Sequence, residues 1–221
     1  GEGVIVSVSL PLETKVSYEM DAANKLIKTS WEEGDKFYMY STWNISNGYE
    51  FTQTGAISED GKFTNFQTTE EGTKRISANS GILFSYPTVY KSSSNGGLRI
   101  KALDGTLEKA LESDMMYAYV KTDSKKVIPN IEFQRATSFF EIKDLDFGAG
   151  VNATLKRVYV IGTPVGSVLK LDTSTGNIST VETDMTIVID PAEWTITDGK
   201  PDKKDPLYAA FIPVPGNQAG E

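Results

Sequence analysis

The sequence predicts an all-β protein made of two β-sandwich domains in tandem. Short segments rich in Val, Ile, Tyr, Phe and Thr recur along its 221 residues. Clusters of Gly, Asn, Asp and Ser divide these segments, and a helical pattern is almost absent. Many short strands separated by turn signals are typical of sandwiches and barrels, whereas parallel α/β folds alternate strands with helices.

The first predicted strand has the most regular pattern in the chain. It is the segment VIVSVSL, residues 4–10. Its alternation places Val4, Val6, Val8 and Leu10 on one face, and Ile5, Ser7 and Ser9 on the other. Because side chains on a strand alternate with a period of two, the first face is expected to be buried.

Ten further segments are predicted to be strands on the same criteria of composition and length. They are residues 36–43, 49–53, 81–86, 115–120, 131–134, 137–143, 155–162, 168–172, 185–190 and 207–214. One short helix is predicted over residues 106–113.

The connections between strands carry turn signals rather than low-complexity linkers. Asp60-Gly61 is a strong hairpin signal, and Gly176 marks another turn. Residues 91–97, KSSSNGG, are expected to form a surface loop. A domain boundary fits best near residues 121–126, which gives an N-terminal domain over residues 1–122 and a C-terminal domain over residues 123–221.

Charge excludes two classes of partner. The chain has 22 Lys and Arg against 30 Asp and Glu, a net charge of −8 and a sequence pI near 4.8. Such a surface repels a phosphate backbone, so we expect neither nucleic acid nor an anionic membrane surface as partner. No apolar run approaches the roughly 18 residues of a membrane-spanning helix.

The absence of Cys and His excludes much of catalytic chemistry. Cysteine nucleophiles, Ser-His-Asp triads and iron sites of two histidines and a carboxylate all need one of these residues. Structural zinc sites nearly always need them too. We therefore predict no catalytic, cofactor-binding or metal-binding residue, and a protein that is not an enzyme.

The remaining candidate sites are weak. Gly162 and Gly166 lack the Gly-Lys-Ser/Thr of a phosphate-binding loop. Paired carboxylates for glycoside hydrolysis stay open, because the fold sets their separation, but nothing in the sequence favours them. Asp198, Asp202 and Asp205 lie beside Lys200, Lys203 and Lys204, and this composition suits a solvated loop better than a calcium site. Asp144 and Asp146 suit a turn. Asn-x-Ser/Thr sequons begin at Asn44, Asn152 and Asn177, but they matter only in a eukaryotic secretory pathway.

The segment WEEGDKFYMY, residues 31–40, is the densest cluster of large side chains. We predict that Gly34 adopts a positive φ in a turn and that Asp35 accepts hydrogen bonds from nearby amides. Trp31 is then expected to pack over the sandwich edge. The following strand places Phe37, Met39 and Trp43 on one face and Tyr38, Tyr40 and Thr42 on the other. A sugar-stacking platform is the alternative interpretation.

The Trp31-Glu-Glu-Gly34-Asp35-Lys-Phe motif resembles the Trp-x-x-Gly-Asp signature of the fimbrillin family, the surface pilin-type proteins of Bacteroidetes. Further landmarks follow in the family's order over nearly the whole chain: FSYP at 84–87, DMMYAYV at 114–120, IEFQRATSFFEIK at 131–143, LKRVYVIG at 155–162 and LYAAFIPVP at 207–215. The chain departs from the family at Gln134-Arg135, where a His is common.

The resemblance implies two transthyretin-like Greek-key sandwiches and export to the outer membrane as a lipoprotein. Because the chain begins at Gly1, we expect its signal peptide to have been removed. Family members continue past the Pro-ended strand at 207–215, so the C-terminal domain is expected to lack its last strands. The resemblance also implies a stalk, tip or anchor subunit of a fimbria, assembled with other pilus subunits by exchange of strands.

In that assembly a protease removes an N-terminal strand, and a neighbour's C-terminal strand fills the groove. Val4, Val6, Val8 and Leu10 are the candidate plug strand, and Lys15 is the candidate processing site, since no Arg precedes Arg75. Two functions remain open. The first is a fimbrial subunit that mediates adhesion to host or bacterial surface ligands, and the second is a surface glycan- or ligand-binding lipoprotein that does not polymerise.

Overall fold

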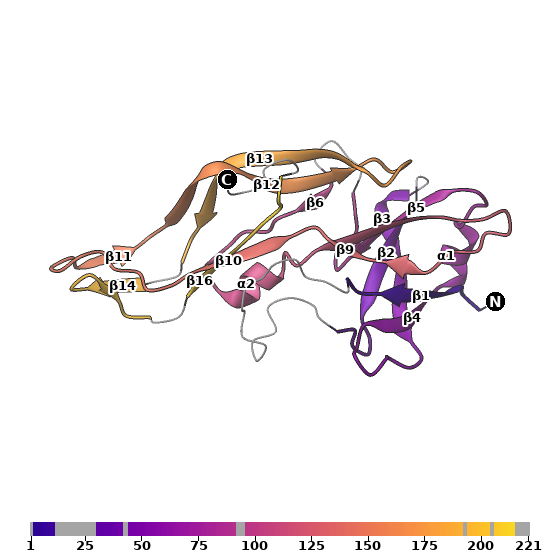
Figure 1. Cartoon of the computed structure of the whole chain (residues 1–221), viewed down its shortest axis with the longest axis horizontal. Coiled ribbons are helices and arrows are strands. Elements are labelled where there is room, and N and C mark those ends of the chain that lie inside the picture. Colours follow the sequence, from indigo (N-terminus) through magenta and orange to yellow (C-terminus); the bar gives the residue numbers. More distant parts are fainter. Residues whose placement is uncertain are drawn as a thin grey trace. The chain divides into compact units, whose positions relative to one another are not determined.

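A computed structural model describes residues 2–11, 30–41, 44–91, 96–191, 194–203 and 206–214. Within them the chain forms strands β1 to β16 and two five-residue helices, α1 and α2 (Figure 1). The prediction of an all-β fold is confirmed, with several sheets that are consistent with β-sandwich domains.

The chain divides into two compact units, and several segments contribute to each. Unit 1 contains Gly1–Leu98, Met115–Ala136 and Leu169–Thr180, and unit 2 contains Arg99–Asp114, Thr137–Val168 and Val181–Glu221. The expected boundary near residue 122 falls within Met115–Ala136, and two domains divided at that position stay a prediction.

Unit 1 is built on an eight-stranded sheet with the order β8-β1-β4-β3-β2-β5-β7-β9. β1 and β8 run parallel, and the other neighbours run antiparallel. The strand bounds are β1 Ile5–Ser9, β2 Lys36–Ser41, β3 Asn44–Thr54, β4 Phe63–Thr68, β5 Gly81–Tyr86, β7 Met116–Lys121, β8 Ile131–Glu132 and β9 Gln134–Arg135.

Aromatic rings from alternate positions of these strands fill the core of unit 1. Phe37 and Phe51 stack with centroids 5.1 Å apart and an interplanar angle of 8°. The ring of Phe37 also meets Phe84 edge-on with centroids 5.5 Å apart, and its centroid lies 4.6 Å from that of Phe66. All four side chains are fully buried. The period-two pattern of the strands therefore produces one continuous apolar layer.

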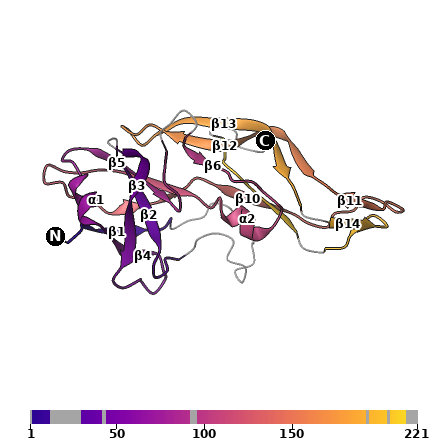
Figure 2. The same cartoon turned by 180° about the vertical axis from the view of Figure 1, so that it is seen from behind.

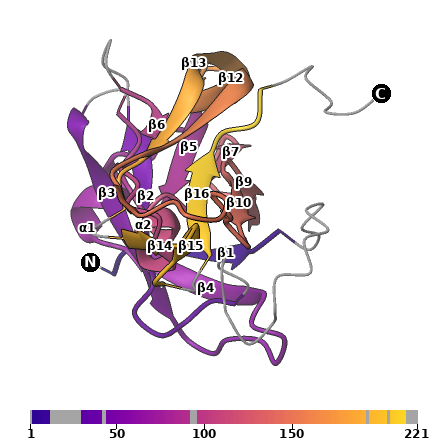
Figure 3. The same cartoon turned by 90° about the vertical axis from the view of Figure 1, so that its left-hand side faces the viewer.

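Unit 2 contains smaller sheets. β10 (Ser138–Ile142) and β16 (Leu207–Phe211) pair antiparallel and lie side by side in Figure 3. β14 (Trp194–Thr197) pairs with β11 (Ala153–Leu155) and with β15 (Lys200–Pro201), and Figure 2 shows β11 beside β14. A further sheet has the order β13-β12-β6, with β13 Ile178–Ile189, β12 Val158–Leu171 and β6 Leu98–Arg99, and its residues are divided between the units, because Leu98 and Leu169–Thr180 belong to unit 1.

Both helices begin at a threonine that caps them. In α1 (Glu70–Lys74) the Thr69 hydroxyl accepts a hydrogen bond from the Gly72 amide, and in α2 (Leu107–Leu111) the Thr106 hydroxyl accepts one from Lys109. Such a cap satisfies an amide that would otherwise lack an intrahelical partner. The helix predicted over residues 106–113 is confirmed, whereas α1 was not predicted.

The strand boundaries differ from the prediction at several places, including two where predicted strands are joined or divided. Residues 155–162 and 168–172, predicted as separate strands, contribute to β11 and to the single long strand β12. The predicted strand 131–134 is divided into β8 and β9. Gly166 pairs with Ile212 inside β12, so tertiary pairing keeps the strand continuous where the prediction ended one strand and began another.

Candidate strand-exchange site

The predicted plug strand lies inside a sheet. β1 has β4 on one side, with a register from Ile5–Gln67 to Ser9–Phe63, and β8 on the other, with Val8 paired to Ile131. Beyond its ends, the Thr68 amide donates to the Val4 carbonyl at 3.1 Å and the Leu10 amide donates to the Lys62 carbonyl at 3.0 Å. Both edges of the strand are therefore hydrogen-bonded.

One face of β1 faces the aromatic core. Val6, Val8 and Leu10 are almost completely buried, and Val4 packs against the same cluster while partly exposed. Ile5, on the opposite face, is 59% exposed. This pattern agrees with the predicted alternation, and the role of the strand as a removable plug stays a prediction.

Ser9 departs from the alternation, because it is buried. Its hydroxyl lies 3.5 Å from the Ile131 carbonyl, which accepts its hydrogen bond, and it accepts one from the Asn130 side chain at 3.4 Å. The Phe133 amide donates to the Ser9 carbonyl at 3.1 Å. A segment about 120 residues further along the chain therefore covers the end of β1, which no local pattern could reveal.

The beginning of β1 is anchored by residues that belong to no predicted site. The Val4 amide donates to the Thr73 hydroxyl at 3.0 Å, and the Gln67 side chain donates to the Gly3 carbonyl at 3.2 Å. A Cβ on Gly3 would lie 1.6 Å from the Thr68 carbonyl oxygen, so only glycine permits this approach.

The Trp31 motif forms the turn that was predicted. Gly34 has a φ of 83°, and the Asp35 carboxylate accepts a hydrogen bond from the Glu32 amide at 2.8 Å. Trp31 is only 2% exposed and meets Phe66 edge-on at 4.9 Å. The ring belongs to the core rather than to an edge or a sugar-stacking surface.

The strand after this turn is buried on more than one face. Phe37 and Met39 are buried as predicted, but Tyr40 is buried as well, because its ring packs edge-on against Tyr90 at 5.7 Å. Trp43 lies outside the described residues.

The loop between β3 and β4 connects the motif to β1. Its Gly61 has a φ of 72°, and the carbonyl of Gly61 accepts a hydrogen bond from the Trp31 amide at 2.8 Å. The Ser58 hydroxyl, and then the Lys62 amide, hold the pKa of the Asp60 carboxyl below its ordinary value. The Asp60-Gly61 turn predicted from the sequence therefore supports both β1 and Trp31.

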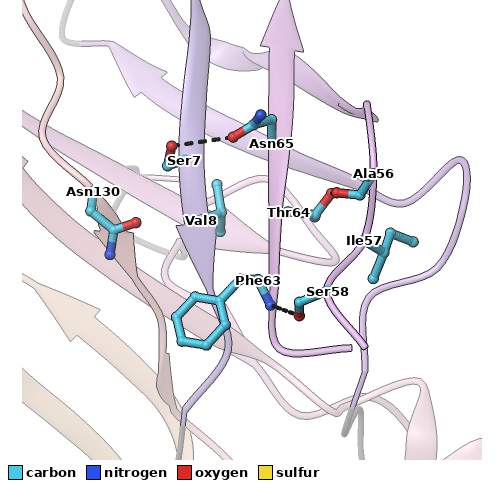
Figure 4. Close-up of a pocket in the computed structure, with 9 residues that line it drawn as sticks. All are labelled: Ser7, Val8, Ala56, Ile57, Ser58, Phe63, Thr64, Asn65 and Asn130. Atoms are coloured by element: carbon cyan, nitrogen blue, oxygen red, sulfur yellow. Dashed lines mark hydrogen bonds between the residues drawn. The ribbon is translucent and has the colours of Figure 1, made fainter. Parts of the chain in front are cut away.

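A pocket of about 440 Å³ opens beside β1 (Figure 4). Its lining includes the Ser7 hydroxyl, which donates to the Asn65 side chain at 3.2 Å, and the ring of Phe63, which is 44% exposed. The other lining residues are Val8, Ala56, Ile57, Ser58, Thr64 and Asn130. None of these side chains is ionisable near neutral pH, so the pocket offers no general acid or base.

The acidic candidates form turns. Gly150 donates its amide to Asp198 at 2.6 Å, and Thr195 donates to Asp202 at 2.9 Å. Asp144 has a φ of 53°, and Lys200 lies 2.6 Å from Asp146 and holds the pKa of that carboxyl below its ordinary value. The described residues contain no group of three or more Asp or Glu able to hold a metal ion.

The other residues singled out in the sequence either lie in turns and strands or fall outside the described residues. Gly176 has a φ of 75° in the turn between β12 and β13. Gly166 lies in β12, where its amide and carbonyl pair with Ile212. The Asn152 side chain accepts a hydrogen bond from the Asp198 amide at 3.0 Å. Lys15, the candidate processing site, and residues 204–205 lie outside the described residues. In the described part of the chain, no helix has the length and apolarity that crossing a membrane requires.

No protein-family model and no curated protein sequence matches the chain. Three solved structures, each of a candidate cell adhesion protein, are similar to it. That from Bacteroides uniformis has 16% identity and a TM-score of 0.44, over 97% of this chain and 75% of its own. The structure from Bacteroides ovatus has 13% identity and a TM-score of 0.43, and the match covers 95% of this chain and 78% of its own. The structure from Bacteroides thetaiotaomicron has 12% identity and a TM-score of 0.33, and the match covers 92% of this chain and 86% of its own. These values assign neither a family nor a function.

Proposed function

We propose that the chain is a structural subunit of a cell-surface fimbria that mediates adhesion, and that β1 is the strand exchanged during assembly. The observation that supports this proposal most is the position of β1, between β4 and β8 with one face in the core. The resemblance of the Trp31 motif and the later landmarks to the fimbrillin family supports the same function.

Removal of β1 would expose the features that an incoming strand needs. The backbone of β4 would lose its partner from Gln67 to Phe63, and the space filled by Val6, Val8 and Leu10 would open toward the aromatic core. In strand addition, backbone hydrogen bonds provide affinity and alternate side chains fill pockets. A free edge with an apolar face also drives association.

The burial of β1 opposes spontaneous release. Each of Val6, Val8 and Leu10 contributes about 1.5–3 kcal/mol when removed from water. Proteolysis in the chain after β1 therefore leaves the strand seated until another strand competes for its place. Exchange of one strand for another replaces both the backbone bonds and the buried area.

A cleavage and competition experiment tests the exchange. A specific protease site placed at Lys15 is cut, and a fluorescent peptide of residues 3–11 is added in excess. We expect the peptide to co-elute with the cut protein but not with the uncut protein. A control peptide that carries Val6→Asp and Val8→Asp should not be retained. Retention of the first peptide by neither form, or equally by both forms, would contradict strand exchange.

Electron microscopy of the native cells tests the fimbrial location. Gold-labelled antibodies against the full-length protein should decorate filaments along their length, at a base or at a tip, and so also assign the subunit's place. Labelling spread over a cell surface without filaments would favour a lipoprotein that does not polymerise.

A further inference from the structure

A second pocket, in unit 2, has the composition of a ligand site. It has a volume of about 320 Å³ and lies against β14 and β15. Its apolar lining comes from Ile142, Leu145, Trp194 and Pro201, and its polar lining from Asp144, Lys200 and Lys203. We refer to it as the Trp194 pocket. Sites of this size that combine apolar walls with a few polar groups commonly bind small ligands.

The loops around the Trp194 pocket are held together. The Phe147 amide donates to the Gly199 carbonyl at 2.9 Å, and the Gly199 amide donates to the Val151 carbonyl at 2.8 Å. The ammonium of Lys200 lies 2.6 Å from the Asp146 carboxylate. Because these contacts fix residues 144–151 against residues 198–200, binding would not have to order the loops first.

The polar lining offers both kinds of hydrogen bond with little net charge. The Asp144 carboxylate accepts hydrogen bonds only, and the ammonium groups of Lys200 and Lys203 donate only. The ammonium of Lys200 lies 2.6 Å from the Asp146 carboxylate just outside the pocket, and the formal charges of Asp144, Asp146, Lys200 and Lys203 cancel. A ligand that matches this arrangement carries hydroxyl groups, since a hydroxyl both donates and accepts, and it carries no charge.

The apolar lining adds a second requirement. Trp194 is buried, with 7% of its surface exposed, and Leu145 is half-buried beside it. The small exposed part of the indole, together with Pro201, Ile142 and Leu145, gives an apolar surface for C–H groups. A sugar ring has hydroxyl groups at its rim and C–H groups on its faces, whereas a linear polyol or an inorganic anion has no such face.

We propose that the Trp194 pocket binds a neutral pyranose ring, as a free sugar or as the end of a surface polysaccharide. The proposal goes beyond the strand exchange of β1 and does not depend on it, because all its residues lie in unit 2. It gives the protein a contact with a carbohydrate surface.

Binding is tested on the intact protein with named sugars. Saturation-transfer NMR with galactose, mannose and glucose, and calorimetry with their linear trisaccharides, separate a free-sugar site from a polysaccharide-end site. Sialic acid serves as the charged comparison. We expect at least one neutral sugar to bind and sialic acid to bind at least tenfold more weakly. Failure of all six neutral probes, or tighter binding of sialic acid, would overturn the proposal.

Substitutions locate the site. Asp144→Asn keeps the shape of the side chain and suits the positive φ of 53°, so the fold should be retained. We expect this variant and Lys203→Gln each to weaken sugar binding about tenfold. Asp184→Asn, at an exposed carboxylate of β13 outside the Trp194 pocket, is the matched control. Equal affinities of Asp144→Asn, Lys203→Gln and the control would show that the sugar binds elsewhere.

Discussion

At the scale of single residues, two glycines with positive φ support the same region for different reasons. Gly34 has a φ of 83° and open space around it, so a Cβ would meet no atom within 4 Å. Gly61 has a φ of 72°, and its Cβ would lie 2.5 Å from the Cβ of Ser30. Both positions disfavour an L side chain, but only the second also lacks space.

We predict that Gly61→Ala lowers the free energy of unfolding more than Gly34→Ala does. The left-handed conformation costs an alanine about 1–2 kcal/mol at either position. At Gly61 the clash with Ser30 adds a displacement of the turn that holds Trp31 and Leu10. Urea unfolding of the two variants measures the difference, and equal losses would contradict the steric contribution.

A second residue-scale prediction concerns alkaline pH. Burial raises the pKa of the Tyr90 hydroxyl, while its hydrogen bond to Leu171 acts in the opposite direction. Burial likewise raises the pKa of Tyr117. Because the folded state keeps these protons longer than the unfolded chain, their stabilisation is full below about pH 10 and is lost as the pH rises through the folded pKa values. Thermal unfolding from pH 8 to 11 should show a falling midpoint.

Tyr90→Phe should show how much the Tyr90 hydroxyl contributes to stability at pH 8 and to the loss of stability at alkaline pH. The Tyr90 hydroxyl donates to the Leu171 carbonyl at 3.1 Å and accepts from the Leu171 amide at 2.9 Å. Its removal should cost about 1–3 kcal/mol at pH 8, because buried polar groups lose a partner. The decline above pH 10 should become shallower, and an unchanged decline would exclude Tyr90 as a contributor.

At the scale of elements, β1 offers a direct comparison of its two faces. Val8 is 1% exposed, and Ile5 is 59% exposed. Val8→Asp would bury a charge in an aromatic core and should prevent folding or cost several kcal/mol. Ile5→Asp should change stability by less than about 0.5 kcal/mol, as surface substitutions usually do. Denaturant unfolding measures the loss of stability in both variants. Equal losses would show that the two faces of β1 are not buried and exposed as described.

The contrast between these two side chains could be predicted from alternation alone. The burial of Ser9 could not, because β8 covers it and the pairing partner Ile131 lies far along the chain. Local pattern also identified β2, β5, β7, β10 and β16, where strand residues are strongly β-branched or aromatic. Among the strands that it missed are β4, whose polar residues occupy both faces, and β14, which is only four residues long.

The Trp194 pocket could not be predicted for a similar reason. Its lining comes from β10, from the loop after it, and from the β14–β15 hairpin about 50 residues later. The sequence predicts a turn at Asp144 and a separate solvated loop at Lys200. Their proximity depends on the hydrogen bonds between those turns, which only the tertiary structure contains.

At the scale of the whole molecule, the order of events in folding bears on strand exchange. β2, β3 and β4 follow one another in the chain and pair as neighbours in the sheet. β1 is bonded to the distant segment at β8, and Ser9 and Ile131 are 122 residues apart in sequence. Contacts of large sequence separation require costly loop closure, so proteins rich in them fold slowly, in milliseconds to seconds.

We therefore predict that the β2–β4 core forms early and that β1 docks late in folding. Val8→Ala, which removes about 1.5–3 kcal/mol of buried contact, should mainly accelerate unfolding and leave the folding rate nearly unchanged. Phe51→Leu, between β2 and β4, should mainly slow folding. Stopped-flow measurements over a range of urea concentrations give both rates. If Val8→Ala slows folding as strongly as Phe51→Leu does, β1 belongs to the folding nucleus, and a strand required that early is poorly suited to be exchanged after the subunit has folded.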